Sequence, residues 1–273
     1  MKKAVNQWCF PEGTPLSTVI EESARAGFWG IELNLQDTGE AGVTLASTCA
    51  DMTTIRKQML DAGIQPSCLS TALLWTAPLS SADRALRERG RQVVLKQVEM
   101  ASALEVDVIL VVPGVVRESD DYEECYRRSQ DELARLADVA QTAGVRIGVE
   151  NVWNKFLLSA LEMKRFVEEI HHPALGVYFD VGNVLQYGYP QQWIHALKSL
   201  IWKVHVKDFV VAVGSGQGFV PLLAGNVNWP AVMQAFRDIG YDDVLTAEIS
   251  PYASSPYQAV RDTSQQMEEI LKM

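Results

Sequence analysis

The chain has 273 residues, 48% hydrophobic and 21% charged, enough to bury a full core as one large domain or two medium ones. Its 24 basic and 34 acidic residues give a formal charge of −10, and with no Lys- or Arg-rich run we expect no nucleic-acid partner. The apolar run that follows Lys2 and Lys3 is stopped by Pro11, too early for a signal peptide or a membrane helix, so we expect a cytoplasmic protein that does not enter a membrane.

Short apolar segments rich in β-branched residues alternate along the chain with longer segments of helical period. This alternation is typical of βαβ units around a parallel sheet. The predicted strands are, in chain order, Val5–Phe10, Gly30–Leu35, Gln65–Thr71, Asp107–Pro113, Arg146–Asn151, Leu175–Val181, Trp202–Asp208 and Val244–Ser250. The longest predicted helices, Ser81–Leu104 and Tyr122–Thr142, carry apolar residues at three- and four-residue spacing.

Glycines punctuate this pattern where helices should end. Four Ala-Gly or Ile-Gly pairs, ending at Gly27, Gly63, Gly144 and Gly240, each precede a predicted strand and indicate left-handed helix caps. Eight strand–helix pairs match the usual size of a TIM barrel, whereas a doubly wound sheet more often has five or six strands. We therefore predict an α/β protein in which residues 1–273 form a single (β/α)₈ TIM-barrel domain.

Four ionisable residues stand at the ends of consecutive predicted strands: Glu150, Asp180, His205 and Glu248. Active sites of TIM barrels form at the C-terminal ends of the strands, so these side chains should meet at one mouth. Four buried ionisable groups at equivalent positions are best explained by a shared metal ion. Three carboxylates and one imidazole favour Mn²⁺, with Mg²⁺, Co²⁺ and Zn²⁺ as alternatives.

These residues stand in four short motifs. In order they are Gly-Val-Glu-Asn (148–151), Phe-Asp-Val-Gly-Asn (179–183), Val-His-Val-Lys-Asp (204–208) and Ala-Glu-Ile (247–249). In order and spacing the chain resembles the sugar phosphate isomerase/epimerase family of xylose isomerase-like TIM barrels, which includes L-ribulose-5-phosphate 3-epimerase and D-tagatose 3-epimerase. The resemblance implies that Glu150 and Glu248 are both metal ligands and the acid/base pair, with Asp180 and His205 completing the coordination.

Two positions depart from the free-ketose epimerases of that family. Phe156 stands where they carry a glutamate, and Asn183 stands where they carry a histidine. The Asp-x-Gly-Asn and His-Val-Lys-Asp forms look closer to the L-ribulose-5-phosphate 3-epimerase branch. The resemblance thus leaves the substrate more open than the chemistry.

The expected reaction is 3-epimerisation of a ketose or ketose phosphate through a metal-stabilised cis-enediolate, with the two glutamates exchanging protons. Aldose–ketose isomerisation of the hydroxypyruvate type, an inosose-type dehydration and a non-catalytic sugar-binding barrel remain alternatives. A homodimer or homotetramer is possible by analogy with relatives.

Further polar and aromatic residues near the predicted strand ends are candidates for binding the sugar. Lys207 shares the strand face of His205 by period-two alternation, although a salt bridge with a neighbouring carboxylate is an equal alternative. The substrate-binding candidates are Asn183, Lys207, Trp153, Asn154, Glu32 and Trp8. The Gly-Ser-Gly-Gln-Gly stretch at 214–218 lacks the context of a nucleotide fingerprint and is interpreted as a mobile loop over the mouth.

Overall fold

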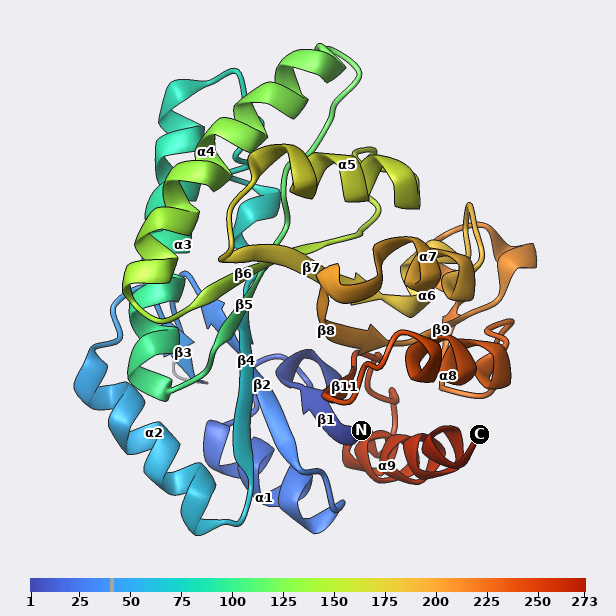
Figure 1. Cartoon of the computed structure of the whole chain (residues 1–273). Helices are drawn as coiled ribbons and strands as arrows, with labels where there is room; N and C mark the ends of the chain where they lie inside the picture. Colours follow the sequence, from blue (N-terminus) through green and yellow to red (C-terminus); the bar gives the residue numbers. More distant parts are fainter. Residues whose placement is uncertain (40–41) are drawn as a thin grey trace.

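The computed structural model describes residues 1–39 and 42–273, and its parallel strands close into a barrel surrounded by helices (Figure 1). The eight barrel strands are β1 (Lys2–Asn6), β2 (Gly30–Gln36), β4 (Gln65–Ser70), β5 (Val108–Val111), β6 (Arg146–Glu150), β7 (Leu175–Asp180), β8 (Ile201–Val206) and β11 (Val244–Ala247). Each pairs in parallel with the next, and β1 pairs with both β2 and β11, which closes the sheet. The predicted TIM barrel is confirmed.

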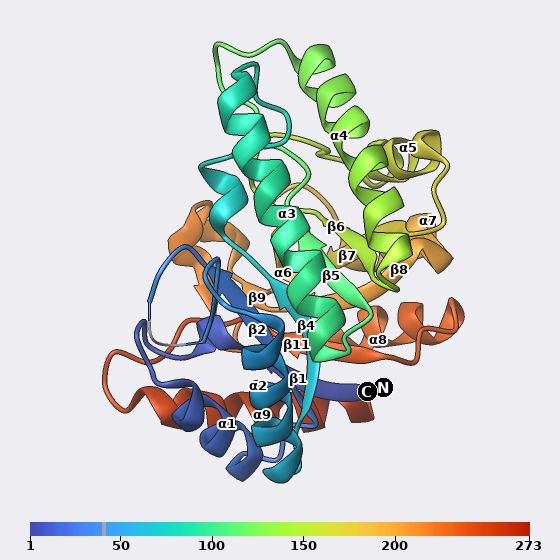
Figure 2. The same cartoon turned by 90° about the vertical axis from the view of Figure 1, so that its left-hand side faces the viewer.

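The helices form the outer layer. They are α1 (Leu16–Arg25), α2 (Cys49–Asp61), α3 (Arg84–Leu104), α4 (Tyr122–Thr142), α5 (Ala160–Ile170), α6 (Val181–Val184), α7 (Pro190–Leu197), α8 (Trp229–Asp238) and α9 (Pro256–Lys272). Figure 2 looks onto α3, with α2 and α4 on either side of it. The glycines at 27, 63, 144 and 240 all have left-handed backbones, with φ between 70° and 78°, so the predicted caps are confirmed.

The first strand lies earlier in the chain than predicted. The expectation was Val5–Phe10, but β1 is Lys2–Asn6, and Gln7–Cys9 form a 3₁₀ turn. The side chain of Asn6 accepts a hydrogen bond from the backbone N–H of Trp8 at 2.7 Å, which ends the strand locally. Trp8 therefore projects from a turn above the barrel and not from a strand.

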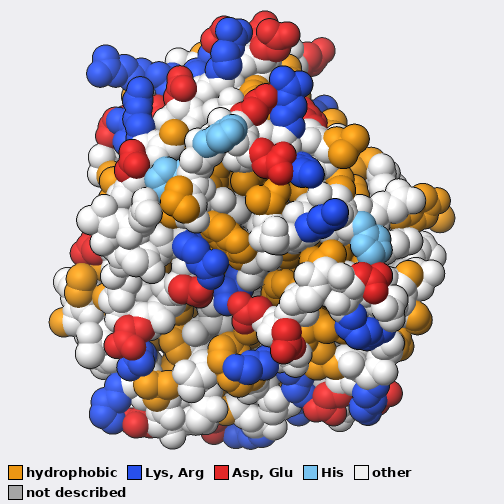
Figure 3. Space-filling view, in the orientation of Figure 1, with side chains coloured by type: hydrophobic (Ala, Val, Ile, Leu, Met, Phe, Trp, Pro, Cys, Tyr) orange, Lys and Arg blue, Asp and Glu red, His pale blue; other side chains and the backbone are white. Residues whose placement is uncertain are grey.

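Three short strands lie outside the barrel: β3 (Val43–Thr44), β9 (Asp208–Phe209) and β10 (Phe219–Val220). The last two pair antiparallel, so residues 210–218 form an excursion that leaves and rejoins the mouth after β8. The glycine-rich stretch predicted as a loop lies here: Gly214 caps a 3₁₀ turn of Val211–Val213, and Gly216–Gly218 form a second one. On the face seen in Figure 3, basic and acidic side chains are interspersed. Ion pairs along the helices include that of Lys57 with Asp61 on α2.

The barrel interior carries polar side chains at several depths. Lys203 is buried at the N-terminal end of β8, where its Nζ lies 2.8 Å from Asp243 and 3.7 Å from Asp107. Burial lowers the pKa of Lys203, but the charges of Asp107 and Asp243 outweigh it and raise the pKa. Burial likewise raises the pKa of Asp107, yet Lys203 and Arg146 outweigh this and hold it below its usual value. This end of the barrel is closed by an ion-pair cluster.

Replacing Lys203 with methionine is expected to lower the free energy of unfolding by about 2 kcal/mol, because two charge-assisted contacts are lost. The pKa of Asp107 is lower in the folded protein than in the unfolded chain. Its contribution to the free energy of unfolding is therefore present above a pH of about 4 and is lost as the pH falls through the lowered pKa. Urea unfolding at pH 7 and pH 3 measures both effects. Lys57→Met, at an exposed pair, is the control with a smaller loss. An equal loss at both pH values would contradict the assignment.

Candidate active site

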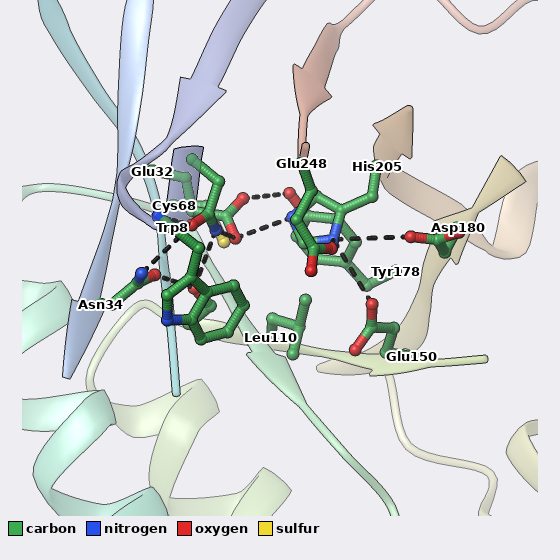
Figure 4. A network of polar contacts seen from close by, with 12 residues as sticks. Trp8, Glu32, Asn34, Cys68, Leu110, Glu150, Tyr178, Asp180, His205 and Glu248 are labelled. Atoms are coloured by element: carbon green, nitrogen blue, oxygen red, sulfur yellow. Dashed lines mark hydrogen bonds and ion pairs between the residues drawn. The ribbon is translucent and has the colours of Figure 1, made fainter. Parts of the chain in front are cut away.

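The ends of four adjacent strands bring the predicted metal ligands together (Figure 4). One ligand atom from each of Glu150, Asp180, His205 and Glu248 lies within 4.8 Å of all the others. His205 Nδ1 is 2.9 Å from Glu248 Oε2, 3.3 Å from Glu150 Oε1 and 3.9 Å from Asp180 Oδ2. We call these four residues the carboxylate–histidine cluster.

Strand register explains why the cluster forms. His205 on β8 is directly opposite Asp180 on β7 and Thr246 on β11, so Glu248 follows one pleat above. The Glu248 N–H donates to the carbonyl of Val206 at 3.1 Å, which continues the ladder past the end of β11. Side chains two residues apart share a strand face, so all four point into the mouth.

Asp180 has a second local role. Its Oδ1 accepts a hydrogen bond from the backbone N–H of Asn183 at 2.6 Å and caps the short helix α6. The Asn151 side chain pairs with the backbone of Asp180 in both directions, at 2.8 Å each. These bonds fix the Asp180 backbone and leave Oδ2 facing the cluster.

Burial and neighbouring charges shift the pKa values of the ionisable groups of the site in opposite directions. Burial raises the pKa of Glu150 to about 7, although the hydrogen bond and charge of His205 act to lower it. Burial also raises the pKa of Asp180. Burial would raise the pKa of Glu248 too, but Lys207 and His205 outweigh it and lower the pKa. Burial disfavours the charged form of His205, yet the Glu32 and Glu248 carboxylates raise its pKa well above the usual value. The site therefore strongly attracts positive charge.

Lys207 supplies part of that charge. Its Nζ lies 2.8 Å from Glu248 Oε2 and 3.0 Å from Asp180 Oδ2, and these carboxylates raise the pKa of Lys207 despite its burial. The salt bridge that the sequence left as one of two alternatives is thus present. Lys207 also lines the cavities at the mouth, so its predicted contact with substrate stays a proposal.

The cluster fits one divalent cation. Asp180 Oδ2 and Glu248 Oε2 are buried and lie 3.0 and 2.8 Å from Lys207 Nζ, so both oxygens face positive charge, and each carboxylate oxygen has a further lone pair for a cation. Three carboxylates and an imidazole form a donor set of the kind that divalent ions take.

Behind His205 lies a network that the sequence did not reveal. Glu32 Oε1 is 2.8 Å from His205 Nε2 and accepts a hydrogen bond from Asn6 Nδ2 at 2.7 Å. Its other oxygen accepts a hydrogen bond from the hydroxyl of Tyr178. A hydrogen on Nε2 directed at Glu32 leaves Nδ1 free to coordinate, the usual arrangement behind a metal-binding histidine.

Glu32 therefore has a different position from the predicted one. It was a candidate for substrate contact, with a structural role as the alternative, and it is fully buried and does not line the two cavities beside the cluster. Asn154 is a second correction. It is buried, its Nδ2 donates to the carbonyl of Gly114 at 2.6 Å and its Oδ1 accepts from the N–H of Phe156 at 3.1 Å. Both polar groups of Asn154 hold the loop after β6, and Asn154 does not line the cavities of the mouth.

Two adjoining cavities open beside the cluster. A cavity of about 190 Å³ is lined by Glu150, Glu248, Lys207 and Asn183, with Trp8, Trp75 and Trp153 among its walls. A cavity of about 320 Å³ shares Trp8, Lys207 and Glu248 and extends past Gly216 to Tyr252. Trp153 packs edge-on against Phe209 and donates its indole hydrogen to the carbonyl of Asn183 at 2.9 Å. The mouth thus holds four of the predicted substrate-binding residues: Trp8, Trp153, Asn183 and Lys207.

Comparison with known proteins identifies the class that this fold and site define. The chain belongs to the xylose isomerase-like TIM barrel family, whose model matches residues 20–271. The putative L-ribulose-5-phosphate 3-epimerase SgbU of Escherichia coli (strain K12) is 27% identical over 222 residues, 79% of this chain and 77% of that protein. The uncharacterized protein MJ1311 of Methanocaldococcus jannaschii is 27% identical over 185 residues, 63% of this chain and 62% of its own.

Solved structures share the fold at lower identity. D-psicose 3-epimerase, crystallised in the presence of D-fructose, has a TM-score of 0.82 at 19% identity and covers both chains completely. The IOLI protein with a bound zinc atom has a TM-score of 0.84 at 19% identity, covering 100% of this chain and 98% of that one. The predicted family is confirmed, and with it the class, a sugar isomerase or epimerase.

Proposed function

We propose that this protein is a divalent-metal-dependent 3-epimerase of a ketose or ketose derivative, with Glu150 and Glu248 as its acid/base pair. The observation that carries the proposal is the carboxylate–histidine cluster, four ligand atoms within 4.8 Å at the mouth of a barrel. L-Ribulose-5-phosphate 3-epimerases among the relatives and D-psicose 3-epimerase among the structural neighbours support the same reaction type. We further propose that residues 1–273 act as one domain.

Glu150, Asp180, His205 and Glu248 would hold the ion, and we propose Mn²⁺ because oxygen donors predominate. When bound, the ion supplies positive charge that stabilises negative charge developing on substrate oxygens. Asp180 and His205 are held by Asn151 and Glu32, so their task is to bind and orient. The two glutamates remain to move protons.

Glu150 and Glu248 come from β6 and β11, with β7 and β8 between them. A sugar seated between the two carboxylates would present opposite faces of one carbon to them. One carboxylate would take the C3 proton, and the other would return a proton to the opposite face, which inverts that centre. Lys207, 2.8 Å from Glu248, would keep that carboxylate charged and donate a hydrogen bond to a substrate oxygen.

The walls serve the same chemistry. Trp8 and Trp153 would exclude water and lie against the sugar, and Asn183 would contact a hydroxyl. Should only one glutamate reach the intermediate, the same residues would perform aldose–ketose isomerisation. That is the second candidate reaction.

The test is solvent exchange. Metal-loaded protein is incubated with ketoses and their phosphates in D₂O, quenched with EDTA and examined by NMR. Deuterium at C3 with formation of the C3 epimer is the expected result. Deuterium at C1 with an aldose product would instead establish isomerisation, and loss of water would establish a dehydratase.

Metal removal should destabilise the fold. Binding at about 1,000 times Kd adds about 4 kcal/mol, which corresponds to roughly 10 °C in Tm for a chain of this size. Differential scanning fluorimetry with and without EDTA measures the shift. Asp180→Asn should abolish the shift, whereas Asp61→Asn on the surface of α2 should keep it. An unchanged Tm under EDTA, with no metal detected by mass spectrometry, would argue against the site.

In the part of the chain that the structure describes, no helix is long and apolar enough to cross a membrane. We propose that the enzyme acts in the cytoplasm on a small sugar, with no nucleic-acid partner. Assembly into a dimer or tetramer is a further proposal, which light scattering would test.

A further inference from the structure

A third cavity opens on the far side of Trp8 from the cluster. We call it the distal cavity; it has about 520 Å³ and is lined in part by Trp8, Phe10, Glu12, Asn34, Asp37 and Ala72. Trp8 lines all three cavities, and Pro251 lines both the distal cavity and that of 320 Å³. Figure 4 shows Trp8 between Asn34 and the cluster. The mouth is therefore longer than the metal site.

The walls of these cavities offer little positive charge. Among the described residues that line them, Lys207 is the one Lys or Arg, and it is already 2.8 Å from Glu248 and 3.0 Å from Asp180. The distal cavity carries Glu12 and Asp37 at its rim, and Asp37 pairs with Arg89 outside the lining. A phosphate dianion in the distal cavity would face carboxylates without an opposing cation.

Several backbone amides at the mouth are already engaged. TIM-barrel phosphate sites usually use loops after strands seven and eight. In the loop after β8, the N–H groups of Val210, Gly214 and Gly218 all donate to carbonyls of the same loop. After β11, the N–H of Ile249 faces Cys9 Sγ, and Pro251 has no N–H. These N–H groups of the two loops are therefore not available to a phosphate.

The distal cavity has the chemistry of a sugar subsite. Trp8 and Phe10 give aromatic surface, and the Gln36 amide with the Glu12 and Asp37 carboxylates gives acceptors for hydroxyl hydrogens. Asn34 lies 2.9 Å from Trp8 Nε1 and accepts its hydrogen when the amide oxygen faces the indole. Trp8 is thus fixed as a wall between the two sides.

We infer that the substrate is an uncharged sugar bearing a second hydroxyl-rich group, such as a glycosyl residue, which occupies the distal cavity, and that it is not a sugar phosphate. This inference rests on the proposed function for the position of the reacting carbon. It differs from the phosphorylated substrate that the names of the curated relatives state.

Three matched compounds test the inference: D-fructose, D-fructose 6-phosphate and isomaltulose, in which O6 of one ketose carries nothing, a phosphate or a glucosyl group. Exchange at the carbon next to the carbonyl in D₂O gives kcat/KM, and calorimetry gives affinity for the metal-loaded protein. We expect isomaltulose to exceed both others by at least tenfold in each measurement. Equal or higher values for the phosphate, or no binding of any compound, would overturn the inference.

Calorimetry separates this inference from the proposed function. Tighter binding of isomaltulose without exchange of any compound would support the subsite and count against the epimerase. Ala72→Phe fills the distal cavity from an exposed position and should lower the isomaltulose-to-fructose ratio at least tenfold. Ala85→Phe, at an exposed position of α3 outside the cavities, should leave the ratio unchanged. A ratio unaffected by Ala72→Phe would place the second group elsewhere.

Discussion

Glu150→Gln and Glu248→Gln are each expected to lower kcat for epimerisation by roughly 10³-fold or more, because each removes a proton carrier that also coordinates the ion. A two-base mechanism predicts a further asymmetry. The glutamate that remains still reaches one face of the sugar, so residual exchange in D₂O should be confined to one C3 epimer. The two variants should retain exchange with opposite epimers, which NMR of each purified epimer measures.

Two controls make this result specific. Glu118→Gln, at an exposed glutamate between β5 and α4, should keep wild-type rates. Calorimetric titration of Mn²⁺ into each variant separates loss of metal from loss of the proton carrier, since rates can be compared at full loading. Residual exchange with the same epimer in both variants would point to a single base and hence to isomerisation.

The strands and the four cluster residues were predictable because two simple signals coincide. Period-two apolar patterns locate the strands, and an ionisable residue that interrupts such a pattern at its C-terminal end is costly unless it has partners. The predicted strands that carry Glu150 and Asp180 end within one residue of the ends of β6 and β7. The four glycine caps marked helix ends and so supported the count of eight strand–helix pairs.

Depth inside the barrel was not predictable. Period two correctly points Glu32 inward, but its height depends on the stagger that closure imposes, and β2 also shifts register between Ile31 and Glu32. Glu32 therefore lies beneath His205 instead of at the mouth. The role of Tyr178 was not predictable because a tyrosine in an apolar strand is typical of a packed core. The partner of its hydroxyl is 146 residues away in the sequence.

At two asparagines, a hydrogen bond of the side chain decided the local structure in a way that the sequence pattern did not predict. Asn6 ends β1 through its own side chain, so the apolar run that continues to Phe10 becomes a turn and carries Trp8 over the mouth. Asn154 was a candidate on sequence after Asn183, and its side chain turns to the carbonyl of Gly114, in a loop 40 residues earlier. Contacts between distant loops decide such cases, and no short window contains them.

The network behind His205 leads to the second large effect. Glu32→Gln preserves shape but replaces one acceptor oxygen with a donor, although His205, Tyr178 and Asn6 all direct hydrogens at this carboxylate. His205 should then lose its fixed tautomer and orientation. We expect the affinity for Mn²⁺ to fall by about 10- to 100-fold. Competition with a fluorescent chelator measures it.

A purely structural role for Glu32 would lower stability without changing metal affinity, so both are measured on the same samples below the Tm. Tyr178→Phe is the matched control, because it removes one hydrogen bond from Glu32 and leaves the contact with His205 Nε2 in place. It should lower Tm while keeping Mn²⁺ affinity within about threefold, well short of the change expected for Glu32→Gln. Equal metal affinities for Glu32→Gln and the wild type would show that His205 is oriented by its strand alone. A loss confined to Glu32→Gln would make Glu32 a positioning residue of the metal site.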